Sequence, residues 1–137
     1  MNAENALTDA DYVTLADFRH TLRQFLAFSE SRAAEFGLTP QQHQALLAIR
    51  GAAASRATVG FVAERLILKP HSATGLVDRL EALGLVSRHI SSEDRRQAIL
   101  TLTKKARSLL DGLSVTHREE IVRIRPLLAD LLARLDT

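Results

Sequence analysis

The feature that most constrains this chain is a change of hydrophobic period at Gly84. Before it, residues 70–83 place apolar side chains at helical spacing, and a shorter helical segment begins after Thr58. After it, residues 86–90 and 98–102 alternate between apolar and polar on either side of a polar turn, which predicts a β-hairpin. Two short helices joined by a tight turn and followed directly by a hairpin make a winged helix-turn-helix.

Longer helical patterns precede this segment. Residues 9–36 carry one apolar stripe of a long helix, which Gly37 ends as a residue that readily adopts a positive φ. The residues TPQQ at 39–42 have the pattern of a capping box, so we expect a second helix over about 40–50. We expect this helix to bury Leu47 in the core.

The chain ends in further helical patterns. Thr103 is expected to cap a helix over about 104–124, and Gly112 leaves a break within it as an open alternative. Pro126 fits the first turn of a helix, so it is expected to begin another one.

The predicted fold class is therefore mainly α with a small β-hairpin wing. A length of 137 residues suits one domain spanning 1–137. We expect that domain to consist of a winged helix-turn-helix lobe at about 39–103 and terminal helices at about 9–36 and 104–136.

Composition argues against an enzyme. The chain has no cysteine, so disulfides, thiolate metal sites and cysteine nucleophiles are excluded. It carries no phosphate-binding loop and no catalytic signature motif, and its five histidines lack metal-ligand spacing. We therefore expect no enzymatic activity, no cofactor and no metal, and Glu119 and Glu120 fit a solvated helix face. The apolar runs are too short to span a bilayer, and no basic signal segment begins the chain, so a cytoplasmic location is expected.

Positive charge is concentrated in the middle of the chain. Residues 56–107 hold 10 of the 18 basic side chains and only 5 of the 16 acidic ones. A basic middle between mildly acidic ends predicts one face that meets a polyanion, although a solvated charged surface gives the same count. All aromatic residues lie before residue 62, which argues against a stacking platform for single-stranded nucleic acid.

Five short motifs can be compared with those of known families: LTPQQHQALLAI at 38–49, LVDRLE at 76–81, GLVSR at 84–88, DRR at 94–96 and LT at 102–103. Together they resemble the DNA-binding lobe of MarR-family regulators. The order and lengths of the expected elements fit the family across roughly residues 10–135. Three positions depart from its pattern: Ile67 stands where glycine is common, Lys69 replaces a capping hydroxyl, and Gly75 replaces a longer side chain. Ile67 implies a different conformation of the turn.

The resemblance implies a sequence-specific, double-stranded DNA-binding transcriptional regulator, most simply a repressor released by a small effector. The first turns of helix 70–83 are the expected base-reading surface. The DNA-binding candidates there are Lys69, His71, Ser72, Thr74, Gly75 and Arg79. For Arg79, an ion pair with a neighbouring acid is an equally open reading, and His71 also fits a solvent-exposed histidine.

In the wing, the resemblance implies that Asp94 fixes the loop while Arg95 or Arg96 enters the minor groove, where negative potential is concentrated. Arg88 on the first strand is expected to touch the DNA backbone or to support the wing.

The resemblance also implies a homodimer on a palindromic operator, since one winged helix makes few base contacts. The interface candidates lie on the terminal helices, where an intramolecular core competes for the same side chains. They are Leu15, Leu113, Ile121, Ile124, Leu128, Leu131 and Leu135.

Many relatives bind a small aromatic or phenolic effector between the terminal helices and the winged lobe. The corresponding candidates are Phe18, Arg19, His20, Phe25 and His43, although a phenylalanine stripe is more often core. Two other functions stay open: a winged-helix protein-interaction module and a non-specific DNA-binding protein.

Overall fold

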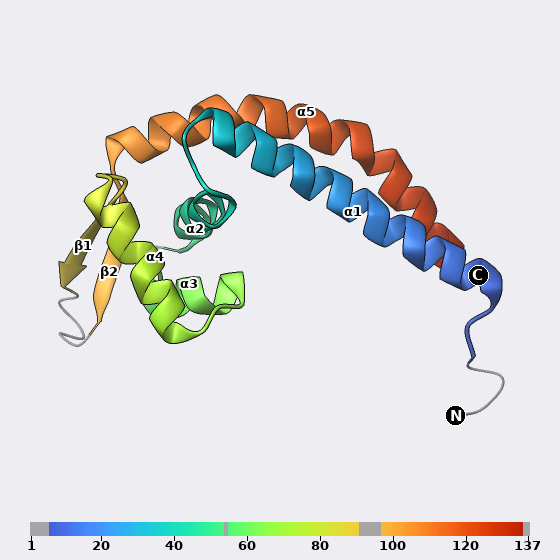
Figure 1. Cartoon of the computed structure of the whole chain (residues 1–137), viewed down its shortest axis with the longest axis horizontal. Helices are drawn as coiled ribbons and strands as arrows, with labels where there is room; N and C mark the ends of the chain where they lie inside the picture. The colour runs from blue at the N-terminus through green and yellow to red at the C-terminus, as the bar shows by residue number, and fades with distance from the viewer. Residues whose placement is uncertain (1–5, 54, 91–96, 136–137) are drawn as a thin grey trace. The chain divides into compact units, whose positions relative to one another are not determined.

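The structure is a computed structural model that describes residues 6–53, 55–90 and 97–135. In chain order its elements are α1 (Asp9–Glu35), α2 (Pro40–Gly51), α3 (Val59–Leu66), α4 (Pro70–Ala82), β1 (Val86–Ile90), β2 (Ala98–Leu102) and α5 (Lys104–Leu135). The mainly helical fold with a two-stranded wing is thus confirmed (Figure 1).

The chain forms two compact units, each described by itself below. Residues 32–114 form one, here called the winged lobe, and residues 1–31 with 115–137 form the other, here called the helical pair. Because α1 and α5 are long, each of them supplies residues to both units.

The winged lobe is closed by its hairpin. β1 pairs antiparallel with β2 in a register that sets Val86 opposite Leu102 and Arg88 opposite Leu100. The backbone N–H of Leu100 also donates to the carbonyl of Ala57 at 2.7 Å, so the loop before α3 lies along the outer edge of β2. This bond ties the start of the helix-turn-helix to the wing.

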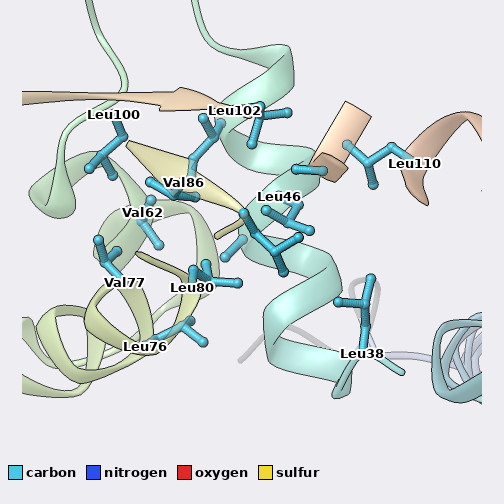
Figure 2. Close-up of a cluster of buried hydrophobic side chains, with 14 of the residues drawn as sticks. Leu38, Leu46, Val62, Leu76, Val77, Leu80, Val86, Leu100, Leu102 and Leu110 are labelled. Carbon is cyan, nitrogen blue, oxygen red and sulfur yellow. The ribbon is translucent and has the colours of Figure 1, made fainter. Parts of the chain in front are cut away.

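A single apolar cluster holds the winged lobe together (Figure 2). Every element of the lobe contributes a buried side chain to it. The members labelled in Figure 2 are Leu38, Leu46, Val62, Leu76, Val77, Leu80, Val86, Leu100, Leu102 and Leu110.

Local signals in the sequence set most helix ends. Thr39 and Gln42 form the expected capping box, with both reciprocal hydrogen bonds present. Thr58 caps α3 by accepting from the backbone N–H of Phe61. After α1, Gly37 adopts φ +78°, and the N–H of Leu38 donates back to the carbonyl of Ala33 at 3.0 Å. Such bonds satisfy helix-end groups that would otherwise lack partners.

The turn between α3 and α4 corrects one expectation. Ile67 does not change the turn: it adopts the left-handed conformation that a glycine would adopt, with φ 55° and ψ 51°. Its N–H caps α3 by donating to the carbonyls of Ala63 and Glu64. For an L-residue this conformation costs roughly 1–2 kcal/mol, so the capping bonds and the docking of both helices keep it in place.

The C-terminal helix corrects a second expectation. Pro126 does not begin a new helix, because α5 continues through it from Lys104 to Leu135. An interior proline removes one hydrogen bond and costs ~3 kcal/mol. Ile124 and Leu131 are buried on either side of it, and Val122, whose carbonyl loses its partner, is exposed to water. Burial on both sides and solvation of the freed carbonyl offset the loss.

Gly112 does not break α5 either, because the ring of Phe36 packs against it. A Cβ at this position would lie 2.7 Å from Cε1 of Phe36. The glycine therefore makes room for an aromatic side chain rather than marking a helix end.

Two core assignments were wrong. Leu47 is 43% exposed, because the buried face of α2 is formed by Ala45, Leu46 and Ile49. Leu83, which the helical spacing of residues 70–83 also assigns to the core, is 46% exposed just after α4.

We predict that Gly112→Ala lowers the free energy of unfolding by about 1–3 kcal/mol relative to Gly75→Ala, because only the former forces Phe36 to move. Gly75 is the matched control, since it is also helical and a Cβ there meets nothing within 4 Å. Chemical denaturation of both variants measures the difference. Equal stabilities would show that Phe36 does not require a glycine at position 112.

Candidate nucleic-acid interface

Helix α4 has two faces of different character. Its buried face is apolar and consists of Ala73, Leu76, Val77 and Leu80. Its exposed face carries His71, Ser72, Thr74, Gly75, Asp78 and Arg79. The helical period alone separates these sets, so packing the first set into the core presents the second to solvent.

The N-terminus of α4 leaves a cation available. Lys69 occupies the N-cap position, and its carbonyl accepts from the N–H groups of Ser72 and Ala73. Its side chain makes no capping hydrogen bond and is exposed. The departure from a capping hydroxyl therefore places an ammonium group at the start of the exposed face.

A hollow of about 520 Å³ lies beside this face. One side is the first turn of α2, from Thr39 to Gln42, and the other is α4. The α4 residues that line it are His71, Ser72, Gly75, Leu76 and Arg79. Four of the six predicted contact residues of α4 therefore line one concave surface.

Gly75 and Thr74 contribute to the exposed face of α4 in different ways. A Cβ on Gly75 would meet no atom within 4 Å, so the glycine leaves the surface open without being required by packing. Thr74 Oγ1 donates to the carbonyl of Pro70 at 3.0 Å, which leaves the oxygen free to accept from a partner but engages its proton. Ser72 is therefore the better hydroxyl donor of the two.

The structure distinguishes the two arginines that lie near the acids of α4. Among the described residues Arg79 makes no ion pair and is exposed. Arg88 on β1 instead contacts Asp78 and has its Nε 3.4 Å from Glu81 Oε2. Arg88 thus joins the wing to α4 and offsets the two acidic charges of the exposed face.

The tip of the wing lies outside the described residues. This includes Asp94, Arg95 and Arg96, whose suggested roles stay predictions. Along the described strands, His89 Nε2 lies 3.0 Å from Thr101 Oγ1 across the hairpin.

The effector candidates are divided between the two units. In the helical pair, Phe18 and Phe25 are half-buried, whereas Arg19 and His20 are exposed. His20 lines a hollow of about 200 Å³ with Thr21 and Leu131. His43 belongs to the winged lobe, where it is 1% exposed.

Phe25 already takes part in a cluster inside the helical pair. The ring of His117 lies edge-on to Phe25 and Phe28, with centroids 6.3 and 6.1 Å away. His117 Nε2 is 2.9 Å from the Oγ of Ser29, which is buried. This cluster joins α1 to α5, and sequence spacing gave no sign of it because 88 positions separate the two residues.

The dimer candidates differ in exposure. Leu113 lies in the core of the winged lobe, and Ile124 and Leu131 are buried as well. Leu15, Ile121 and Leu135 are exposed, and Leu128 is half-buried. The first three already have packing partners within one chain, so the other four are available to a second one.

Glu120 is not on a solvated face. Its side chain is buried, and Arg123 Nε donates to its Oε2 at 3.0 Å. This hydrogen bond, together with the charge of Arg123, lowers the pKa of Glu120 despite the opposing effect of burial.

Sequence reasoning missed one residue of the winged lobe. Gln41 is exposed and lines the hollow beside α4, but only the tertiary packing of α2 against α4 reveals this. The sequence marked Ile67 as a departure at a position where glycine is common, but it did not show that this side chain is 92% exposed in the turn before α4.

No group of three or more histidine or acidic side chains within the described part of the chain is arranged to hold a metal ion. In the same residues, no helix combines the length and apolar character needed to cross a bilayer.

Comparisons with known proteins agree with this architecture. Residues 36–97 match the sequence model described as MarR family. A 55-residue segment is 42% identical to the HTH-type transcriptional regulator YfiV of Bacillus subtilis (strain 168), covering 40% of this chain and 34% of YfiV. The match thus spans about a third of that relative.

Two solved structures extend the similarity over most of the chain. One is AbsC, a MarR family transcriptional regulator from Streptomyces coelicolor, with TM-score 0.76 and 22% identity over 96% of this chain and 90% of AbsC. The other is CouR from Rhodococcus jostii RHA1 bound to p-coumaroyl-CoA, with TM-score 0.66 and 26% identity over 77% of this chain and 73% of CouR.

We predict that Arg88 and Asp78 are energetically coupled. A double-mutant cycle with Arg88→Met and Asp78→Asn should give about 0.5–1 kcal/mol of interaction energy, the upper range for an exposed pair, and less at high salt. Denaturant titrations measure it. Arg79→Met is the control and should show no coupling to Asp78. Additive effects of the first pair would mean that Arg88 does not hold α4.

Proposed function

We propose that this chain, whose residues 36–97 match the sequence model of the MarR family, is a MarR-family regulator of transcription that binds double-stranded DNA sequence-specifically. MarR-family regulators are generally not enzymes. The observation that carries the proposal is the exposed face of α4, which is polar and begins with the uncommitted ammonium group of Lys69.

Helix α4 can bind DNA by entering the major groove. The groove of B-DNA is about 12 Å wide and admits one α-helix, whose first turns then meet the base edges. Ser72, Thr74 and His71 occupy those turns and carry groups that donate to or accept from bases. Arg79, about two turns further on, is placed for a backbone phosphate.

The charged side chains around α4 also favour DNA as the partner. Asp78 and Glu81 would repel a polyanion, but Arg88 pairs with both. The sequence supplies two further cations, Arg95 and Arg96, which lie outside the described residues. We assign them to the minor groove, with Asp94 as the residue that fixes the loop.

We predict different effects for reading and anchoring residues. Ser72→Ala should change which base is preferred at one or two operator positions, at a cost of about 1–3 kcal/mol on the preferred sequence. Lys69→Ala should weaken binding to all duplexes alike and reduce the salt slope by roughly one unit. Selection of bound duplexes from a random pool, followed by titration in increasing salt, measures both.

The same experiment separates the alternatives. Binding of the unaltered chain with no sequence preference would point to a non-specific DNA-binding protein. Absence of binding to any duplex would point to a protein-interaction module and overturn the proposal.

We further propose that the regulator is a homodimer on a palindromic operator. The helical pair leaves two apolar stripes in water. On α1 the exposed members are Leu15, Leu22 and Leu26, and on α5 they are Ile121, Leu132 and Leu135, with the half-buried Leu128 between them. Each set recurs at helical spacing, and contiguous exposed apolar surface of this kind marks an interaction site.

We predict that Ile121→Asp with Leu132→Asp converts the dimer into a monomer, because a carboxylate in an apolar interface lacks a partner. Operator affinity should fall steeply although the winged lobe is unchanged. Sedimentation and operator titration measure the two effects. The control Ala133→Asp adds one carboxylate two positions from the buried Leu131, toward the opposite side of α5, and should leave the mass unchanged. A monomeric unaltered chain at micromolar concentration would contradict the proposal.

A small aromatic or phenolic effector completes the proposal. This part of the proposal is supported by the similarity to CouR, whose structure was solved with p-coumaroyl-CoA bound. The candidate residues in the helical pair are Phe18, Arg19, His20 and Phe25.

We predict reciprocal linkage for such an effector. A compound that lowers operator affinity tenfold must bind the DNA-free protein tenfold more tightly than the complex, a difference of ~1.4 kcal/mol. Titration of p-coumaroyl-CoA and phenolic acids into free protein and into the complex tests this. If every such compound binds the free protein and the DNA complex with equal affinity, this class of ligand does not regulate DNA binding.

A further inference from the structure

Ile67 combines two properties that stability does not explain. Its side chain is 92% exposed, so it contributes little to the core. Its backbone has φ 55°, a region that β-branched residues avoid. Figure 1 shows the turn that carries it, which joins α3 to α4.

Glycine would adopt this conformation without strain. The exposed isoleucine therefore adds strain and places an apolar group in water, with no compensating burial in the free protein. Backbone strain of this kind occurs mostly at functional sites. The capping bonds hold the backbone in place but leave the side chain exposed, so a partner that covers the side chain would supply the missing compensation.

The surroundings of Ile67 indicate which partner. Lys69, two residues later, begins the exposed face of α4, and its ammonium group is not used by the helix. Arg65 and Glu64 are exposed at the end of α3, so the charges nearest in sequence sum to a cationic turn. A cationic turn at the start of the reading helix fits DNA.

We infer that Ile67 is a specificity-determining residue that packs against the methyl group of one thymine at the edge of the operator. The inference rests on the proposed function and adds one base position to it. The C5-methyl of thymine is the only apolar group that the bases present in the major groove. Contact with it shields the exposed isoleucine, while Lys69 meets the flanking phosphate.

The test uses the full chain and the duplex it selects from a random pool. Ile67→Gly should raise the melting temperature by about 2–6 °C, because the strain is removed. The same variant should bind the selected duplex about 3–10-fold more weakly, the range expected for one apolar contact. Higher stability together with lower affinity is an outcome that loss of folding cannot produce.

Replacing each thymine in turn by deoxyuridine, which lacks only the methyl group, identifies the partner. At one position the unaltered protein should lose about 3–10-fold in affinity, and Ile67→Gly should lose nothing further there. Leu83→Ala is the control, because Leu83 is exposed at the other end of α4. This variant should keep the deoxyuridine effect.

Three results would overturn the inference. The first is that Ile67→Gly binds the selected duplex as tightly as the unaltered protein does. The second is that Ile67→Gly binds every deoxyuridine duplex more weakly than the unaltered protein does. The third is that the melting temperature of Ile67→Gly does not rise. The second would assign Ile67 to sugars or to a protein partner. Failure of the proposed function looks different, because the unaltered chain would then select no sequence from the pool.

Discussion

Burial of one face of α4 is the constraint on which the rest of this molecule depends. Ala73, Val77 and Leu80 are completely buried. Since a helix turns by a fixed amount per residue, this burial also fixes which side chains face water. The polar exposed face, which we propose as the surface that reads DNA, is thus a consequence of how the core is packed and needs no interaction of its own to orient it.

The elements around α4 convert this orientation into a rigid surface. Thr103 Oγ1 donates to the carbonyl of Gly84 at 2.7 Å, and Lys105 Nζ donates to the carbonyl of Leu83 at 3.1 Å. Both bonds tie the end of α4 to the start of α5. Arg88 joins the same helix to the wing. Reading helix and wing are therefore supported from both strands and from α5, as a site on a rigid scaffold requires.

The helical pair follows a different principle. Its packing includes the cluster of His117 with Phe25 and Phe28, which joins α1 to α5. Much of its apolar surface stays exposed, in contrast to the closed core of the winged lobe. A segment that buries only part of its apolar surface within one chain gains stability from a second chain. We therefore assign assembly to this unit and DNA contact to the other.

The sequence by itself determined the features that depend on neighbours a few residues apart. Thr39 and Gln42 cap α2, Gly37 ends α1, and the change of period at Gly84 separates helix from hairpin. Each acts through backbone groups within one turn, so local patterns were sufficient. The reading face of α4 followed from the same periodicity.

Tertiary structure decided the features that depend on distant groups. Continuity of α5 through Pro126 and Gly112 requires burial of Ile124 and the ring of Phe36, which no local pattern contains. The choice of Arg88 over Arg79 as partner of Asp78 follows from the position of β1 beside α4. Ile67 is held left-handed by the hydrogen bonds of its N–H to the end of α3, between two helices that pack in the core. Local preferences are worth about 1–3 kcal/mol each, and the packing of whole elements outweighs them.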